Sequence, residues 1–297
     1  MLQALVHPLL SQKSISLFVW REDLNHAVIS GNKWHKLQPW LQAAEVEGCR
    51  HLLSFGGRHS NHLHALAYAC QQRGWRSTGW VRGHATQGMT ATLADCLRWG
   101  MCVHFVSRHQ YKQRYTPQWT INAQASWPGA MIIPEGGTGE LGVSGVRAWG
   151  EQLAKQLPEA SHVLVPVGSG GTLAGLVTAL SPQHSVVAVP VVKPFASLLN
   201  ELTTVYHLPA FEVWPGAGRG FGRHTNEEIA FDDFFTQQFG VVLDPVYTLK
   251  VAWQFWQRLL AGQLEPGSSW ILIHTGGLQG RRDWETGVKR VQCRETL

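Results

Sequence analysis

The segment from His162 to Leu180 constrains the fold of this chain most strongly. Residues 162–167 form a short apolar run rich in β-branched residues, and residues 173–180 are apolar and helix-forming. The loop between them, Gly168–Thr172, has the sequence GSGGT. A buried strand that leads directly into a helix is a βα unit, and such units build parallel sheets with helices on both faces. The sequence therefore predicts an α/β fold.

The same alternation recurs along most of the chain. Further strands are predicted at residues 15–20, 51–55, 77–81, 101–106, 185–192 and 269–274, and further helices at residues 33–48, 62–73, 90–99, 138–156, 226–239 and 246–260. A polar stretch at residues 107–129 is predicted to be irregular, and residues 215–220 to form a flexible connection. A length of 297 residues suits two lobes. We expect a large domain from residues 1–36 and 136–297, and a small domain from residues 37–135.

Composition excludes several classes of protein. The net charge is +5, but only 15% of the residues are charged, and no basic run exceeds Arg281-Arg282, so no nucleic-acid partner is expected. The long uncharged stretch at residues 162–192 contains Pro166 and a glycine cluster, which argues against a membrane span. Five cysteines without a CxxC pair, and a start unlike a signal peptide, predict a reducing, cytoplasmic location.

The loop Gly168-Ser169-Gly170-Gly171-Thr172 admits two interpretations. Glycines let backbone N–H groups converge on an anion, and the following helix dipole favours a phosphate. The second interpretation is that the loop only forms a tight turn between the strand and the helix. The loop lacks the lysine of a Walker A motif, the last glycine of GxGxxG and the first glycine of a hydrolase elbow.

A pair of lysines marks the start of a helix in the sequence GNKWHKL. Lys33 and Lys36 are one helical turn apart and share a face. They are either a solvated basic pair or, because Trp34 and Leu37 flank them, desolvated amines. A desolvated lysine with a lowered pKa is what Schiff-base chemistry requires.

The sequence GGRHSNH also joins a predicted strand to a helix, so it is a second potential anion site, suited to a carboxylate. Ser60 and Asn61 are its candidate ligands, although either can simply cap the helix. His59, His62 and His64 suggest a metal site, but no acidic or cysteine ligand accompanies them, and none is expected.

Two sequences near the end of the chain, DPVYT and IHTGG, complete the candidate site. Tyr247 and Thr248 precede a predicted helix, and Thr275 follows a predicted strand. Ligands bind at the carboxyl ends of parallel strands. Taken alone, Tyr247 reads as a core aromatic residue and Thr248 as a helix cap.

Together the motifs GNKWHKL, GGRHSNH, VGSGGTLAG, DPVYT and IHTGG, with IPEGGTGELGVSG, resemble the 1-aminocyclopropane-1-carboxylate deaminase / D-cysteine desulfhydrase family. The resemblance spans about residues 30–280. It implies the pyridoxal-phosphate fold type II, like the tryptophan synthase β subunit: two three-layer α/β lobes with mostly parallel sheets. It also implies pyridoxal 5′-phosphate in the cleft, a small amino-acid substrate and a homodimer.

Position by position, the resemblance implies a role for each candidate residue. Lys33 matches the Schiff-base lysine, and Lys36 the lysine that helps to hold the phosphate. Ser60 and Asn61 match the pair that binds the substrate carboxylate, with Asn61 near the cofactor's 3′-oxygen, and His62 follows them. The remaining matches are the phosphate loop Gly168, Ser169, Gly170, Gly171 and Thr172, the active-site Tyr247, and Thr248 and Thr275 beside the pyridine ring.

The resemblance also bears on the substrate. Deaminases of the cyclopropane amino acid carry Glu and Leu where this chain has Thr248 and Thr275, as in D-cysteine desulfhydrases. We therefore expect α,β-elimination on a small D-amino acid, D-cysteine first. The alternatives are a deaminase of 1-aminocyclopropane-1-carboxylate, a pyridoxal-phosphate-binding protein without turnover and, more distantly, a metal-dependent hydrolase. Phe221-Gly222 stands where the family has its second tyrosine and glycine, which also points to a desulfhydrase. Arg58-His59 replaces the family's Ile-Gln and either reshapes the substrate pocket toward an anionic or bulkier amino acid or faces solvent.

Overall fold

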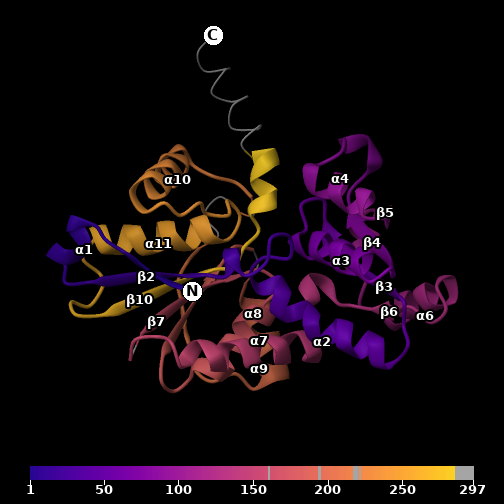
Figure 1. Ribbon diagram of the computed structural model, residues 1–297, viewed down its shortest axis with the longest axis horizontal. Helices are drawn as coiled ribbons and strands as arrows, with labels where there is room; N and C mark the ends of the chain where they lie inside the picture. Colours follow the sequence, from indigo (N-terminus) through magenta and orange to yellow (C-terminus); the bar gives the residue numbers. More distant parts are fainter. Residues whose placement is uncertain (160, 193–194, 217–219, 221, 285–297) are drawn as a thin grey trace, which may run out of the picture. The chain divides into compact units, whose positions relative to one another are not determined.

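The computed structural model describes residues 1–159, 161–192, 195–216, 220 and 222–284 (Figure 1). The chain forms two compact units. The first contains residues 1–26, 30–32 and 143–278, and the second residues 27–29, 33–142 and, within the described part, 279–284. The longest continuous part of the second unit covers residues 33–142, whereas the small domain expected from the sequence covers residues 37–135. The C-terminal residues 279–284 also group with it.

The first unit is built on a six-stranded sheet. Its strands are β1 (Leu2–Leu5), β2 (Ser16–Arg21), β7 (His162–Val167), β8 (Ser185–Pro190), β9 (Glu212–Val213) and β10 (Ser269–His274). Their order is β1-β2-β10-β7-β8-β9, and only β1 runs antiparallel to its neighbour. Its helices are α1 (Pro8–Gln12), the 3₁₀ turn η1 (Glu22–Leu24), α7 (Glu140–Ala154), which begins in the second unit, α8 (Gly171–Leu180), α9 (Ala196–Tyr206), α10 (Asn226–Phe239) and α11 (Thr248–Leu260).

Alternate residues of the central strands divide between two hydrophobic cores. Val163 and Val165 of β7 pack with α7, α8 and α9, whereas Leu164 packs on the opposite face with α10 and α11. Figure 1 shows these two groups of helices on either side of the sheet. Both faces of the strand are covered, which is why the sequence of β7 is continuously apolar rather than alternating.

The second unit contains a four-stranded parallel sheet in the order β5-β4-β3-β6. Its strands are β3 (His51–Gly57), β4 (Arg76–Arg82), β5 (Met101–Val106) and β6 (Met131–Ile132). Its helices are α2 (Asn32–Val46), α3 (Asn61–Gln72), α4 (Ala91–Arg98), α5 (Arg108–Lys112) and α6 (Pro117–Ser126), with the 3₁₀ turns η2 (Ala85–Gln87) and η3 (Glu135–Gly137). A further turn, η4 (Leu278–Gly280), follows β10. The prediction of an α/β fold with mostly parallel sheets is therefore confirmed.

One face of this sheet is covered by aromatic side chains. Phe55 of β3 stacks on Trp80 of β4, with ring centroids 5.3 Å apart. Trp119 of α6 lies 4.6 Å from Phe55 and 4.4 Å from Trp80, and Trp127 packs against Trp80 at 5.1 Å. Trp80, Trp119 and Trp127 therefore belong to the hydrophobic core of the second unit.

The stretch at residues 107–129 is not irregular, as the sequence suggested, but contains α5 and α6. Each helix has a capping residue: Ser107 accepts a hydrogen bond from Gln110 N at 3.2 Å, and Thr116 accepts one from Trp119 N at 3.4 Å. The sequence does not reveal these helices because only Tyr111 and Ala123 in them are buried, which is too few to produce a helical period of apolar residues.

Part of the expected connection at 215–220 and Phe221 lie outside the described residues. None of the described helices combines the length and the apolar composition that a membrane span requires.

Candidate active site

In the first unit, the GSGGT loop joins the end of β7 to the start of α8. Gly170 is the N-cap residue of α8 and has φ +85°, a left-handed conformation that glycine adopts without strain. Because glycine has no side chain, the first amide groups of α8 receive no side-chain cap. The uncapped amides and the positive end of the helix dipole together suit a phosphate.

The loop glycines are also required by their neighbours. A Cβ on Gly170 would lie 2.2 Å from Leu202 Cδ1, and one on Gly168 would lie 2.9 Å from Tyr247 Cε1. The Tyr247 ring therefore packs directly on the loop. The structure thus brings Tyr247 to the candidate phosphate site, where the sequence alone placed it only by resemblance.

Replacing Gly170 by alanine should weaken cofactor binding at least tenfold and destabilise the protein by about 2–3 kcal/mol, since backbone strain and overpacking against the buried Leu202 add. Gly74→Ala is the matched control, because Gly74 has φ +65° but nothing within 4 Å of the added Cβ. We expect this control to lose about 1 kcal/mol of stability and to bind pyridoxal phosphate normally. Cofactor titration and thermal unfolding of both variants measure the two effects. Equal cofactor affinity in both variants would contradict the assignment of the loop.

The two residues before Lys33 are fixed to the same region of the first unit. Asn32 Nδ2 donates a hydrogen bond to Thr172 Oγ1 at 2.7 Å, and Asn32 N donates to the Thr275 carbonyl at 3.4 Å. A Cβ on Gly31 would lie 1.9 Å from the Thr275 carbonyl oxygen, so only glycine permits this approach. The Gly-Asn dipeptide thus holds the chain against both α8 and the end of β10, and Lys33 is the next residue.

The two threonines of the candidate site differ in their surroundings. Thr248 is fully buried at the start of α11; its hydroxyl accepts a hydrogen bond from Asp244 N at 2.6 Å and donates to the Asp244 carbonyl at 3.2 Å. This hydroxyl therefore closes a local turn. Thr275 directly follows β10 and is 7% exposed. Its position, at the carboxyl end of a central parallel strand, is where α/β proteins bind ligands.

In the second unit, both lysines lie against the turn η3. Lys33 Nζ and Lys36 Nζ donate to the carbonyl of Gly136 at 3.4 Å and 3.3 Å. Burial lowers the pKa of Lys33 to about 8, against the opposing effect of the Glu135 charge. Burial, and then the charge of Lys33, lower the pKa of Lys36 well below its usual value. Lys36 is 1% exposed and Lys33 is half-buried, so the structure supports the interpretation of these lysines as desolvated amines rather than a solvated pair.

Glu135, which the sequence did not single out, belongs to a polar cluster next to the lysines. Tyr111 Oη donates to Glu135 Oε1 at 2.6 Å, and Arg114 forms an ion pair with Glu135 at 2.8 Å. The only sequence signal for it was its place in the IPEGGTG motif. Its carboxylate is the acidic group whose charge acts on the amine of Lys33.

His62 is buried in the same unit with one ring nitrogen satisfied. Ser54 Oγ donates to the Ile133 carbonyl at 2.7 Å, so it acts as the acceptor toward His62 Nε2 at 2.8 Å. Burial, and then the charges of Lys33 and Lys36, lower the pKa of His62 well below its usual value. The ring is therefore neutral, and its Nδ1, which has no partner among the described residues, is a hydrogen-bond acceptor.

Ser60 and Asn61 begin helix α3. Ser60 is the N-cap and its Oγ accepts a hydrogen bond from Leu63 N at 3.2 Å, so the capping reading is confirmed. A Cβ on Gly56 would lie 2.4 Å from Ser60 Oγ, which explains the glycine before this turn. Asn61 is half-buried, and its Oδ1 accepts a hydrogen bond from Gln279 Nε2 at 2.6 Å.

The remaining residues of the GGRHSNH motif have other partners. Arg58 donates to the carbonyls of Gln87 and Gly88 at 2.8 Å and 2.6 Å, so it holds the η2 loop. His59 pairs with Asp283 at 3.3 Å, and His64 with Asp95 at 3.1 Å. The structure therefore does not bring the three histidines together. Among the described residues, no group of three or more His, Cys, Asp or Glu side chains is arranged to hold a metal ion.

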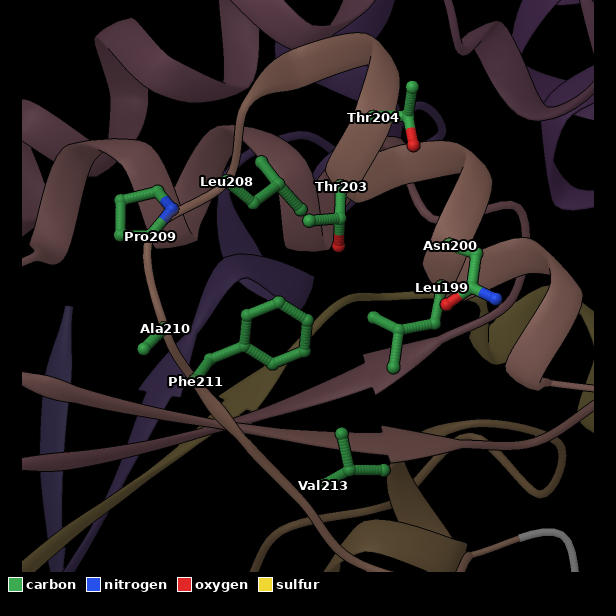
Figure 2. Close-up of a pocket in the computed structure, with 9 residues that line it drawn as sticks. All are labelled: Leu199, Asn200, Thr203, Thr204, Leu208, Pro209, Ala210, Phe211 and Val213. Carbon is green, nitrogen blue, oxygen red and sulfur yellow. The ribbon is translucent and has the colours of Figure 1, made fainter.

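A groove of about 400 Å³ lies in the first unit between α9 and β9. Figure 2 shows Leu199 and Phe211 among its lining side chains, and none of the predicted site residues lines it. The groove therefore has no part in the chemistry of the candidate site.

The two units offer complementary chemistry for one type of cofactor. The first provides uncapped amide groups behind a glycine loop, which suit a dianionic phosphate. The second provides an amine of lowered pKa, which suits covalent attachment of an aldehyde. Both features of pyridoxal 5′-phosphate are thus matched by residues that are present.

Comparison with known proteins supports this assignment. The D-cysteine desulfhydrase of Klebsiella pneumoniae is 25% identical over 287 residues, covering 88% of this chain and 86% of the relative. The bifunctional D-cysteine desulfhydrase/1-aminocyclopropane-1-carboxylate deaminase of Arabidopsis thaliana is 26% identical over 294 residues, covering 90% and 73%. The crystal structure of an ACC deaminase homologue matches the fold with a TM-score of 0.80 at 24% identity, over 94% of this chain and 90% of that one. The family model of pyridoxal-phosphate dependent enzymes matches residues 5–276. The chain therefore belongs to the pyridoxal-phosphate dependent enzyme family, and its cofactor is pyridoxal 5′-phosphate.

Proposed function

We propose that this protein is a lyase that catalyses α,β-elimination on a small D-amino acid, with D-cysteine as the first candidate. The observation that carries the choice of substrate is the pair Thr248 and Thr275. Thr275 directly follows the central strand β10, and the hydroxyl of Thr248 is engaged by the Asp244 backbone. A hydroxyl stabilises a charged pyridine ring less than a carboxylate does, and expulsion of a thiolate needs less assistance than opening of a cyclopropane. Relatives are named both as D-cysteine desulfhydrases and as putative 1-aminocyclopropane-1-carboxylate deaminases, so they support the class of reaction, and the choice of substrate rests on the two threonines.

In this proposal Lys33 is the catalytic base as well as the residue that holds the cofactor. Its pKa of about 8 leaves a useful fraction of the amine neutral near pH 7, so Nζ can accept the proton from Cα of the substrate. Bound pyridoxal phosphate supplies the electron sink for the pair left at Cα. Thiolate then leaves from Cβ, and water completes the conversion of D-cysteine to pyruvate, ammonia and hydrogen sulfide.

The other site residues bind and orient in this proposal. Ser60 and Asn61 would hold the substrate carboxylate, and Asn61 would also lie next to the 3′-oxygen of the cofactor. Tyr247 would stand beside the reacting side chain as an acid or positioning group. His62 Nδ1, as an acceptor, would contact a donor group of the substrate rather than its carboxylate. The phosphate would be held by Gly168, Ser169, Gly170, Gly171 and Thr172, with Lys36 assisting, and the pyridine ring would lie beside Thr248 and Thr275.

We also propose, from the family resemblance, that the protein is a homodimer. We further propose that it resides in a reducing compartment, the cytoplasm. Cys49, Cys70, Cys96 and Cys102 are free thiols in the structure. Burial raises the pKa of Cys70 and of Cys96 to about 12, which keeps both thiols protonated and inert. Free thiols are common in a reducing compartment.

The direct test is an incubation of the reconstituted enzyme with D-cysteine, L-cysteine and 1-aminocyclopropane-1-carboxylate, each in a separate tube. We expect pyruvate and sulfide in equal amounts from D-cysteine, with a kcat/KM at least tenfold above that for L-cysteine. Release of 2-oxobutanoate and ammonia from the cyclopropane substrate would instead favour the deaminase. Binding of the cofactor with no product from any amino acid would identify a binding protein without turnover.

A further inference from the structure

The segment after β10 returns to the second unit and contacts Asn61. Gln279 Nε2 donates a hydrogen bond to Asn61 Oδ1 at 2.6 Å, and both side chains are half-buried. The two residues are 218 positions apart, so the contact is created by the fold alone. Neither the sequence motifs nor the family match, which ends at residue 276, includes Gln279.

Contacts of two aspartates, Asp95 of α4 and Asp283 of the segment itself, anchor residues 279–283. Arg282 forms an ion pair with Asp95, which also pairs with His64 at 3.1 Å and with Arg98 at 2.6 Å. Burial alone would raise the pKa of Asp95, but the hydrogen bonds from Arg282 and His64 hold it below its usual value. Asp283 accepts a hydrogen bond from Ala91 N at 3.1 Å at the start of α4.

These contacts hold residues 279–283 in place independently of the Asn61 contact. In the ion pair with Asp95, the Asp95 side chain is buried at 7% exposed and the Arg282 side chain is half exposed. A helix N-terminus such as that of α4 favours an anionic partner, so Asp283 adds a second attachment. The Gln279 amide is therefore presented to Asn61 from a fixed backbone.

We propose that Gln279 is a positioning residue that sets the orientation of the Asn61 amide toward the cofactor. This inference rests on the proposed role of Asn61 next to the 3′-oxygen of pyridoxal phosphate. That oxygen is a hydrogen-bond acceptor, so Asn61 must present Nδ2 to it. In the structure the amide of Gln279 donates to Asn61 Oδ1, and this arrangement leaves Nδ2 of Asn61 for the ligand.

Two nearly isosteric variants test this proposal. Gln279→Met removes the donor, and Gln279→Glu replaces it with acceptor oxygens that favour the opposite orientation of the Asn61 amide. We expect Gln279→Met to raise the dissociation constant of pyridoxal phosphate threefold to tenfold, and Gln279→Glu to raise it more than tenfold. Both constants are measured by titrating apoprotein with the cofactor, and thermal unfolding of each apoprotein verifies that it folds.

A double-mutant cycle separates positioning from a structural role. In an Asn61→Ala background, neither change at Gln279 should alter cofactor affinity further. Asp283→Asn is the matched comparison, since it weakens one of the two attachments of the same segment and keeps the Gln279 amide, so its loss of cofactor affinity should be smaller than that of Gln279→Met.

The proposal is overturned if Gln279→Glu binds the cofactor like the wild type. It is also overturned if the loss persists in the Asn61→Ala background, or if Asp283→Asn loses as much affinity as Gln279→Met. These results leave the elimination reaction of the wild type unaffected. Failure of the wild type to convert D-cysteine would overturn the proposed substrate and leave the binding measurements valid.

Discussion

The Lys33→Ala variant will lose covalent attachment of pyridoxal phosphate and at least about 10³-fold in kcat, because one amine serves both as attachment point and as base. Borohydride reduction of the wild-type holoenzyme, followed by peptide mass spectrometry, should place the pyridoxyl group on Lys33. In the variant the same treatment should label no lysine. Its apoprotein should be at least as heat-stable as the wild type, since the substitution removes a desolvated amine.

Lys112→Ala is the control for this experiment. Lys112 is an exposed residue of α5 in the same unit, and its loss should change neither labelling nor turnover. Retention of wild-type activity by Lys33→Ala, or labelling of Lys36 in the wild type, would contradict the assignment of Lys33.

The strands whose bounds are predicted best are those with a glycine or polar residue at both ends. β5, β7 and β10 match the prediction residue for residue, because each is an apolar run bounded by glycine or polar residues. Helix α10 also matches, since Thr225 caps its start and Gly240 its end. Strand β9 was missed because two exposed residues carry no alternating pattern.

The candidate site was predictable where its residues lie at the junction of a strand and a helix. The glycine loop, Lys33 and the Ser60-Asn61 pair all lie at helix starts, which have local signals. Ser54 and Gln279 have none: one is a serine inside a buried strand, and the other acts through a contact 218 positions away. Such residues become visible only when the fold brings distant segments together.

The rate at which the apoenzyme captures pyridoxal phosphate should rise with pH and level off with a midpoint near pH 8. Only the neutral amine attacks the aldehyde, and burial lowers the pKa of Lys33 from 10.5 to about 8. Below the midpoint, this shift increases the neutral fraction about 300-fold relative to an unperturbed lysine. Stopped-flow absorbance between pH 6 and pH 10 measures the midpoint, and a rate that continues to rise to pH 10 would contradict a desolvated Lys33.

Changing Glu135 to glutamine should move this midpoint to lower pH. The Glu135 charge raises the pKa of Lys33, so its removal lowers that pKa, and the Arg114 charge then left without its ion pair acts in the same direction. Glu151→Gln removes an exposed carboxylate paired with Arg147 and should leave the midpoint unchanged. Because the cofactor's own titration is common to all three proteins, the difference between midpoints isolates the effect on Lys33. A midpoint that stays in place or rises in Glu135→Gln would show that Glu135 does not act on the amine of Lys33.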